Sequence, residues 1–282
     1  MKHIENLIGD IEEVVTSKDL KVDDETKEKL IQECLKDIEG NLREFLEVRQ
    51  ERDSFTLRMS NIGVAKRKLW YDKHGDNEKE EMPARLLLTF LQGHILEAVL
   101  LMLVEMSGHE ISNKQTEVKV EGIVGHMDCV IDDCLIDVKT AAPYSYKEKF
   151  VNGGLLEGKD PFGYSLQADS YAHALGLERR GWLVMNKATG ELNLLMNDSF
   201  INNAVGDIQA TKEALEQDTP PDRCYNDKED GKAGNRILGS DCGYCNHKIH
   251  CWPGLRAFKY SNGLKWFTNV VKEPKVEELS LS

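Results

Sequence analysis

The chain has 282 residues, of which 40% are hydrophobic and 30% are charged, and its formal net charge is -13. This is enough apolar material for one large domain, with or without appendages. A balance this acidic excludes a generally basic surface that coats nucleic acid, but it leaves room for a local basic groove.

Residues 1–55 alternate apolar and charged side chains at helical spacing, with a break near Asp23-Asp24. This pattern predicts an N-terminal helical segment of two amphipathic helices that ends in the charged run VRQERD. The segment is either an accessory hairpin or a partner-binding arm. A shorter helix over about 60–71 follows. The first residues lack a basic region before an apolar one, so we expect no signal peptide and a cytoplasmic protein.

The segment LLLTFLQGHILEAVLLMLV, residues 86–104, is long enough to span a membrane. However, Gln92, His94 and Glu97 lie at its middle, where polar groups are costly in a bilayer. We therefore expect a buried helix over residues 82–107 and no membrane partner.

The rest of the pattern alternates strands and helices. We expect strands at about 115–121, 124–131 and 134–139, a helix at 162–177, strands at 181–187 and 191–196, and a helix at 199–216. The pair Asp132-Asp133 fits a turn between the second and third strands. This order predicts an α/β fold, a mixed layer architecture with a central sheet.

Two carboxylates and an ammonium interrupt the apolar stretch GHMDCVIDDCLIDVKT, residues 125–140. Asp137 and Lys139 share one face of their strand, because side chains alternate with period two. Asp128, on the preceding strand, can come close to them. Hard cations such as Mg²⁺ take carboxylate oxygens, and a cation with an ammonium offsets the repulsion between two carboxylates. Spacing alone leaves open an ordinary hairpin with these side chains on its wet face.

Four motifs in chain order resemble those of the PD-(D/E)XK nuclease superfamily, in the RecB-like branch with the CRISPR adaptation nucleases and phage-type exonucleases. In this sequence they are Gly93 with Glu97 in GHILE, Gly125 to Asp128 as G-x-x-D, Asp137-Val138-Lys139 as D-x-K, and Gln167 to Tyr171 as Q-x-x-x-Y. The matched span covers roughly residues 60–255. Each motif is weak alone, and the four in order are strong.

The resemblance implies a PD-(D/E)XK, restriction-endonuclease-like core over residues 56–222, with a central mixed sheet flanked by helices and a catalytic centre. Its catalytic residues would be Asp128, Asp137, Lys139, Glu97, Gln167 and Tyr171. Mg²⁺ or Mn²⁺ would be held by the three carboxylates and the backbone carbonyl of Val138. The metal would lower the pKa of a water and stabilise charge on the phosphate.

The resemblance also gives roles to the remaining side chains. Lys139 would orient the attacking water, steady the transition state, or deprotonate the water if the metal lowered its pKa. Gln167 and Tyr171 would position Lys139 or the DNA backbone. Two alternatives stay open: Glu97 as a buried carboxylate bonded to a lysine or to backbone, and Tyr171 as a packing residue.

A Cys-rich segment, residues 223–258, follows the core. Cys242, Cys245 and Cys251 form C-x2-C-x5-C, a spacing typical of thiolates that grip one metal. This trio resembles the C-terminal cysteines of the iron–sulfur nucleases of the same branch. In those proteins the fourth cysteine lies upstream of the core, where this chain has Ala65. We take Cys224 as the replacement.

Weaker candidates for the fourth ligand are Cys34, His247 and His250. Structural Zn²⁺, a structural [4Fe-4S] cluster and no metal all stay open for this segment. Cys129 and Cys134 are expected to be core or near-surface thiols. The C-terminal tail, residues 259–282, is polar and expected to be disordered beyond Lys272.

Basic and aromatic side chains are the candidates for DNA binding, since cations neutralise phosphates and rings stack on bases. They are Lys66, Arg67, Lys68, Tyr144 and Lys147. The alternative for the first three is a solvated helix face.

The resemblance implies a Mg²⁺- or Mn²⁺-dependent deoxyribonuclease, most often an exonuclease in this branch, with a role in DNA recombination, repair or end processing. Its partners would be DNA and recombination or replication proteins, and a phage role is an analogy. A nucleic-acid-binding adaptor on a degenerate nuclease fold is the alternative. A structural protein stapled by zinc, with a chance D-x-K, is the third hypothesis.

Overall fold

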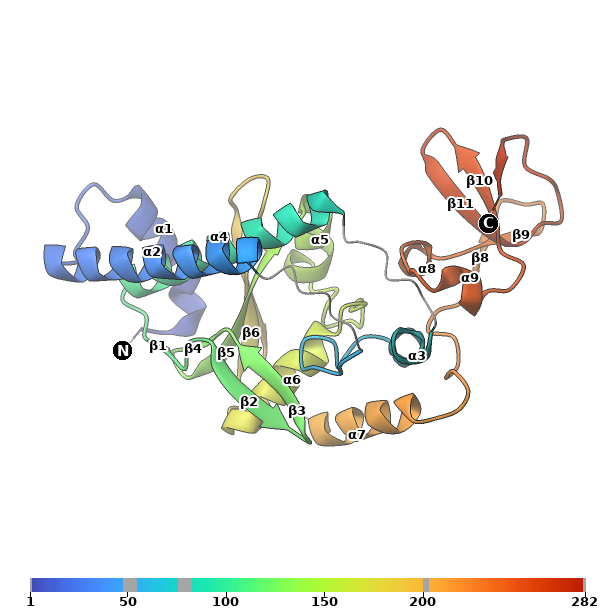
Figure 1. Cartoon of the computed structure of the whole chain (residues 1–282). Helices are drawn as coiled ribbons and strands as arrows, with labels where there is room; N and C mark the ends of the chain where they lie inside the picture. The colour runs from blue at the N-terminus through green and yellow to red at the C-terminus, as the bar shows by residue number, and fades with distance from the viewer. Residues whose placement is uncertain (1, 48–54, 76–82, 200–202, 281–282) are drawn as a thin grey trace. The chain divides into compact units, whose positions relative to one another are not determined.

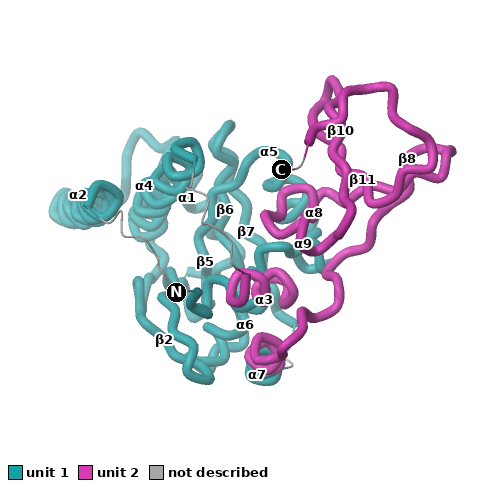
Figure 2. The backbone as a smooth tube through the Cα atoms, turned by 45° about the vertical axis from the view of Figure 1, so that its right-hand side comes forward, with its two compact units in different colours: residues 1–63, 78–209 teal, residues 64–77, 210–282 magenta. Residues whose placement is uncertain are grey.

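The structure is a computed structural model that describes residues 2–47, 55–75, 83–199 and 203–280. It divides into two compact units (Figure 2). Unit 1 comprises residues 1–63 and 78–209, and unit 2 comprises residues 64–77 and 210–282. The sequence predicts other boundaries, at 55, 222 and 258. The predicted charged helix end at 48–53 and the predicted helical residues 82 and 200–202 lie outside the described residues.

Unit 1 contains most of the predicted α/β pattern. Its elements are η1 (Ile4–Asn6), α1 (Leu7–Thr16), α2 (Asp24–Glu47), α4 (Ala84–Met106), β1 (Ile111–Ser112), β2 (Thr116–Val120), β3 (Ile123–Met127), β4 (Cys129–Ile131), β5 (Cys134–Ala141), α5 (Pro143–Ser145), the π-helix η2 (Tyr146–Val151), α6 (Tyr164–Leu175), β6 (Arg180–Asn186), β7 (Leu192–Asn197) and α7 (Ala204–Leu215), which continues into unit 2.

The central sheet has the strand order β1-β4-β5-β6-β7, as Figure 1 shows in part. β5 and β6 pair in parallel, with Asp137 opposite Trp182, and the other neighbours pair antiparallel. β2 and β3 form a separate two-stranded sheet. The mixed central sheet that the sequence predicts is therefore confirmed.

Helices cover both faces of this sheet. Along β5 and β6, Leu135 and Trp182 pack in the cluster that includes Tyr171 of α6. The alternate residues Ile136 and Leu183 pack in the cluster that includes residues of α1 and α4. Strand side chains alternate between faces, so the helix on each face buries one half of the strand pattern.

A tight turn joins β4 and β5, as the sequence predicts. Asp132 and Asp133 have φ of 45° and 61°, a left-handed conformation that aspartate tolerates better than most residues. The chain thus reverses within two residues and sets β4 against β5 in the register Cys129 to Ile136.

α4 is only partly buried, which corrects the prediction of a buried helix. Leu100, Leu101 and Val104 pack in the core, but Leu88 and Phe90 near its start are at least half exposed. Within the described part of the chain, α4 alone is long and apolar enough to cross a membrane, and 22% of its most apolar window is buried. Core helices of soluble proteins meet the same criterion, so this is weak evidence.

Unit 2 has a sheet of its own that the sequence does not predict. Its elements are α3 (Lys66–His74), the end of α7, β8 (Lys228–Asp230), β9 (Asn235–Ile237), α8 (Ser240–Gly243), α9 (Lys248–Cys251), β10 (Arg256–Tyr260), β11 (Gly263–Asn269) and β12 (Glu278–Leu279). The antiparallel strand order is β12-β10-β11-β9-β8. Phe258 and Phe267 meet edge to face in its core, with ring centroids 5.1 Å apart.

The polar tail is ordered where we predict disorder. Leu279 pairs with Ala257, and Glu278 also accepts hydrogen bonds from Arg256. Arg256 bonds Glu273 as well. These contacts join residues about twenty positions apart, which local composition does not encode.

Candidate active site

Asp128 lies where the chain leaves the β2–β3 hairpin and enters the central sheet. It occupies the single position between β3 and β4, so the predicted strand 124–131 is in fact two strands. The last paired residues of β4 and β5 are Cys129 and Ile136. Beyond them, Asp128 Oδ2 accepts a hydrogen bond from the backbone N–H of Val138 at 2.7 Å. The backbone N–H of Val138, which lies beyond the last residue pair of β4 and β5, thus orients the carboxylate of Asp128.

Asp137 and Lys139 point to the same face of β5, as their spacing predicts. Lys139 Nζ lies 2.8 Å from both carboxylate oxygens of Asp137. Only Oδ1 has hydrogen-bond geometry, and the buried Oδ2 has no hydrogen-bond partner within the described part of the chain. We therefore treat Oδ2 as attracted to the ammonium of Lys139 but able to accept a hydrogen bond or to bind a cation. The side chain of Asp137 is 5% exposed.

Glu97 is the third carboxylate and comes from α4. Its Oε1 accepts a hydrogen bond from Gln115 Nε2 at 2.9 Å, and the backbone N–H of Gln115 donates to the carbonyl of Asp128 at 2.9 Å. Burial, followed by repulsion from Asp128, raises the pKa of Glu97 to about 8. Gln115 therefore links the carboxylate of Glu97 to the backbone of Asp128, and nothing in the sequence motifs indicates this residue.

The carboxylates and the ammonium act on one another electrostatically. Burial raises the pKa of Asp137 to about 7, with Lys139 opposing and Asp128 adding to the shift. For Lys139, burial acts to lower the pKa, but the charges of Asp137 and Asp128 outweigh it, so the pKa is raised. Without a metal, Lys139 therefore stays an ammonium. In this site Lys139 is therefore suited to act as a positive charge and a hydrogen-bond donor, and not as a general base.

Gln167 and Tyr171 lie one turn apart on α6 and contact each other. Gln167 Nε2 donates to the Tyr171 hydroxyl at 3.4 Å, and that hydroxyl donates to the carbonyl of His126 in β3 at 2.9 Å. Burial raises the pKa of Tyr171 to about 12. These bonds attach α6 to β3, and the role of the pair in positioning Lys139 stays a prediction.

Steric crowding explains why the G-x-x-D motif has a glycine at position 125. A Cβ on Gly125 would lie 2.3 Å from Cβ of Met59 and 2.7 Å from the hydroxyl of Tyr171. Real Cβ atoms do not come so close to other heavy atoms. Glycine thus allows α6 to approach β3 closely enough for the Tyr171–His126 bond. The sequence shows this glycine but not its partner.

Tyr164 at the start of α6 is a further neighbour of the site. The ammonium of Lys139 lies 5.4 Å from the centroid of its ring, within the range of a cation–π interaction. Burial raises the pKa of the Tyr164 hydroxyl. None of the four motifs includes this tyrosine.

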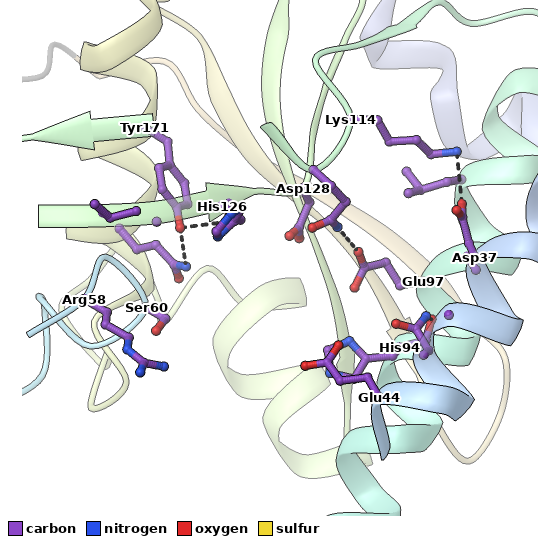
Figure 3. Close-up of a pocket in the computed structure, with 18 of the residues that line it drawn as sticks. Asp37, Glu44, Arg58, Ser60, His94, Glu97, Lys114, His126, Asp128 and Tyr171 are labelled. Carbon is purple, nitrogen blue, oxygen red and sulfur yellow. Dashed lines mark hydrogen bonds and ion pairs between the residues drawn. The ribbon is translucent and has the colours of Figure 1, made fainter. Parts of the chain in front are cut away.

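A cavity of about 1060 Å³ opens beside Glu97 and Asp128 (Figure 3). Its walls come from several elements: α2, residues 56–60, α4, residues 114–115, β3 and α6. Gln167 and Tyr171 also line it. The wall from α2 is a finding that the sequence does not predict, since the N-terminal helices carry no motif.

The side chains of the candidate active site are not close enough together to coordinate a metal ion in this structure. In residues 2–47, 55–75, 83–199 and 203–280, no three His, Cys, Asp or Glu side chains group closely enough to hold an ion. The carboxylate set nevertheless fits a hard cation in its chemistry. It has oxygen donors only, and one buried oxygen of Asp137 has no hydrogen-bond partner among the described residues. The charge of Asp128 acts to raise the pKa of both Glu97 and Asp137. The carbonyl of Val138 as a ligand stays a prediction.

The predicted Cys-rich metal-binding segment is not seen either. Burial, and then the charges of Cys245, Cys251 and Cys224, raise the pKa of Cys242 to about 11. They do not group as a metal site among the described residues. Zinc and iron–sulfur therefore find no support here.

The weaker metal candidates have other surroundings. Cys34 is buried in α2 of unit 1. His247 Nε2 lies 2.6 Å from Asp72 Oδ1, and the ring of His250 lies near Tyr71. Cys129 and Cys134 are fully buried, which agrees with their prediction as core thiols.

Three predicted DNA contacts, Lys66, Arg67 and Lys68, lie on α3 in unit 2. Arg67 Nε donates to Cys251 Sγ at 3.1 Å, and another of its nitrogens donates to the carbonyl of Pro221. Its guanidinium is thus engaged within unit 2. In unit 1, the side chain of Tyr144 is exposed on α5 and Lys147 lies in η2. DNA binding by these five residues stays a prediction.

Comparison with known proteins gives weak likenesses. No protein-family profile matches the chain, and no curated protein matches it. An alkaline exonuclease from Laribacter hongkongensis has 14% identity and a TM-score of 0.37, over 55% of this chain and 89% of its own. A phage-related exonuclease from Haemophilus somnus 129PT has 14% identity and a TM-score of 0.39, over 58% and 92%.

A third solved structure, SSO0001, has 16% identity and a TM-score of 0.41, over 76% of this chain and 93% of its own. Solved structures similar to the chain thus include exonucleases. At such identities and TM-scores they assign neither a family nor an activity to it. The proposal that follows rests on the geometry of the site and on the four sequence motifs.

Proposed function

We propose that the chain is a metal-dependent DNA nuclease of the PD-(D/E)XK type that hydrolyses phosphodiester bonds. The observation that carries the proposal is the meeting of Asp128, Asp137 and Lys139 beside the middle of β5, with Glu97 close enough to repel both carboxylates. Without a cation, the buried Asp137 and the half-buried Glu97 and Asp128 repel one another, which costs free energy. A bound dication relieves that repulsion.

Glu97, Asp128 and Asp137 are the residues that would hold Mg²⁺ or Mn²⁺. When bound, the ion lowers the pKa of water and neutralises charge on the phosphate. The side chains contribute the rest. Asp128 is fixed by the N–H of Val138, and Lys139 keeps its charge and donates to the attacked phosphate or to the nucleophilic water.

The finer parts of the proposal are an exonuclease action on DNA and a place in the RecB-like branch. Both derive from the four motifs in their order along the chain. A role in recombination, repair or end processing, together with recombination or replication proteins, follows the same resemblance.

The test is digestion of end-labelled single-stranded and duplex DNA by the full chain with Mg²⁺, with Mn²⁺ and with EDTA. The proposal expects degradation from the ends with either ion and none in EDTA. Circular DNA without ends should survive if the action is exonucleolytic. Retention of DNA without cleavage under all conditions would contradict the nuclease proposal and select a binding adaptor.

A further inference from the structure

Lys139 carries the positive charge of the proposed active site, and its ammonium must be held in place to act there. The ammonium is a compact charge at the end of a flexible four-carbon stem. Asp137 Oδ1 accepts one of its hydrogen bonds at 2.8 Å. This contact weakens once Asp137 holds a cation, because the cation neutralises the carboxylate and repels the ammonium. A contact that does not depend on Asp137 would keep Lys139 in place.

The Q-x-x-x-Y pair does not supply this contact through a hydrogen bond. Gln167 donates to the hydroxyl of Tyr171, and that hydroxyl donates to the carbonyl of His126. Within the part of the chain that the structure describes, neither side chain is hydrogen-bonded to Lys139. The hydrogen bonds of the pair connect α6 with β3, so another group must hold the ammonium.

The ring of Tyr164 is the group that faces the ammonium. Lys139 Nζ lies 5.4 Å from the ring centroid, inside the range of about 6 Å in which an aromatic face attracts a cation. The attraction comes from the quadrupole of the ring, so it persists when Asp137 is neutralised. The side chain of Lys139 is only 25% exposed, and Tyr164 is half-buried. Removal of water from such a contact strengthens it.

Two features of the backbone fix the position of Tyr164. It is the first residue of α6, and its N–H donates to Asp160 Oδ1 at 3.0 Å. Gly163, just before it, has a φ of 77°, a left-handed conformation that favours glycine. A Cβ on Gly163 would lie 2.2 Å from the carbonyl carbon of Gly63, so only glycine allows this close approach. The start of α6 is thereby held against the segment that contains Gly63.

Two further rings restrict the orientation of Tyr164. Its ring stacks with Phe162, with centroids 5.5 Å apart and planes at 29°. It also stacks with the buried Phe150, with centroids 6.5 Å apart and planes at 24°. Stacking on neighbouring rings limits rotation of the Tyr164 side chain. The ring therefore presents its face to the ammonium in a fixed orientation.

We propose that Tyr164 is a positioning residue for Lys139: its ring holds the ammonium beside Asp137 through a cation–π contact, so that the ammonium can donate to the attacked phosphate. The hydroxyl of Tyr164 is not required, since phenylalanine offers the same kind of ring face. The inference rests on the proposed nuclease function for its catalytic sense. The contact itself can be measured in metal-free protein, without cleavage.

The first measurement is NMR of the full chain with ¹³C-labelled lysine in EDTA, where the Lys139 signal is the one lost in Lys139→Met. Wild type is compared with Tyr164→Phe, Tyr164→Leu and Tyr164→Met, and the use of two variants without a ring guards against a folding defect in one. We expect the ε-methylene protons of Lys139 to lie upfield of those of exposed lysines in wild type and Tyr164→Phe, with nuclear Overhauser contacts to an aromatic ring. Both features should be lost in the other two variants. An unchanged Lys139 signal in them would overturn the inference.

Tyr260 and Lys265 provide a matched control. Lys265 Nζ lies 4.8 Å from the centroid of the Tyr260 ring, and both residues belong to unit 2, whereas Lys139 and Tyr164 belong to unit 1. Tyr260→Leu should move the Lys265 signal, leave the Lys139 signal unchanged and keep the wild-type rate of cleavage. A Lys139 signal that moved equally in Tyr260→Leu and Tyr164→Leu would contradict a specific contact with Tyr164.

The second measurement is single-turnover cleavage of DNA with Mg²⁺. Tyr164→Leu should cleave about tenfold more slowly than wild type, and Tyr164→Phe should remain within about twofold of it. In a Lys139→Met background, Tyr164→Leu should lose less than about twofold, since the ring then has no ammonium to position. An equal loss in both backgrounds would make Tyr164 a packing residue and overturn the inference. If no protein cleaves while the Lys139 signal still depends on the ring, the nuclease function is rejected and the positioning of Lys139 stands.

Discussion

The carboxylates of unit 1 and the cysteines of unit 2 are both predicted metal ligands, but different forces position them. Asp128 and Asp137 are placed by strands, and their carboxylates are fixed by a backbone N–H and by Lys139. The cysteines lie on short helices and loops, where Arg67 and Asp72 of α3 contact Cys251 and His247. Ligands placed by a sheet are oriented before an ion arrives, whereas local spacing of cysteines does not orient them.

Removal of the ammonium beside Asp137 should have a large effect on cleavage. Lys139→Met removes a charge in contact with the proposed site, so cleavage should fall roughly 10²- to 10³-fold while Mn²⁺ still binds. The measurement is single-turnover cleavage together with titration of Mn²⁺. Lys259→Met, on the exposed part of β10 in unit 2, is the matched control. Unchanged cleavage in Lys139→Met would remove the lysine from the mechanism.

The repulsion between the carboxylates predicts a pH dependence of stability in metal-free protein. Because the pKa of Glu97 is raised from 4.5 to about 8 in the fold, the folded state binds this proton more tightly than the unfolded state. Stability should therefore fall as the pH rises from about 4.5 to about 8, by on the order of 2–4 kcal/mol.

Chemical denaturation in EDTA at several pH values measures this loss. Glu97→Gln cannot titrate, so its free energy of unfolding should change less over the same range. Glu110→Gln, at an exposed position, should keep the wild-type profile. Parallel profiles for wild type and Glu97→Gln would mean that Glu97 is not repelled in the fold.

In unit 2, protein contacts rather than a metal should carry the stability. Asp72→Ala leaves the buried His247 without its carboxylate partner, which should cost about 1–3 kcal/mol. Hydrogen exchange of the strands β8 to β12 reports this loss, and the exposed Asp222→Ala is the control. If Asp72→Ala has no effect but a chelator unfolds these strands, the cysteines hold a metal after all and the contrast between the units fails.

Tyr171→Phe gives the smallest expected effect. It removes the hydroxyl that donates to the carbonyl of His126, so unfolding should become easier by about 0.5–1.5 kcal/mol. Cleavage should fall by less than about tenfold, since the hydroxyl attaches α6 to β3. A loss as large as that of Lys139→Met would place Tyr171 in the chemistry and confirm the role that the motif implies.

Residue patterns predict much of unit 1. The order of helices and strands and the shared face of Asp137 and Lys139 follow from periodicities of 3.6 and 2. The turn at Asp132-Asp133 follows from the preference of aspartate for turns. Such patterns are local, and each is imposed by one element burying one face.

The rest depends on contacts between distant parts of the chain. The α2 wall of the cavity, the bond of Gln115 to Glu97 and the pairing of Leu279 with Ala257 have no local signal. In the sequence, a polar loop residue such as Gln115 has no feature that indicates its partner, because only the fold brings the carboxylate of Glu97 close to it. For the same reason, C-x2-C spacing alone does not fix a metal site in unit 2.

The most direct test of the account compares the same substitution at two positions of one hairpin. Asp137→Asn changes the buried carboxylate, and Asp133→Asn changes an exposed one in the turn. The measurement is the rate of cleavage of end-labelled single-stranded DNA with saturating Mn²⁺. We predict a loss of at least about 10³-fold in Asp137→Asn and wild-type rates in Asp133→Asn. Equal rates in the two variants would contradict the assignment of this site.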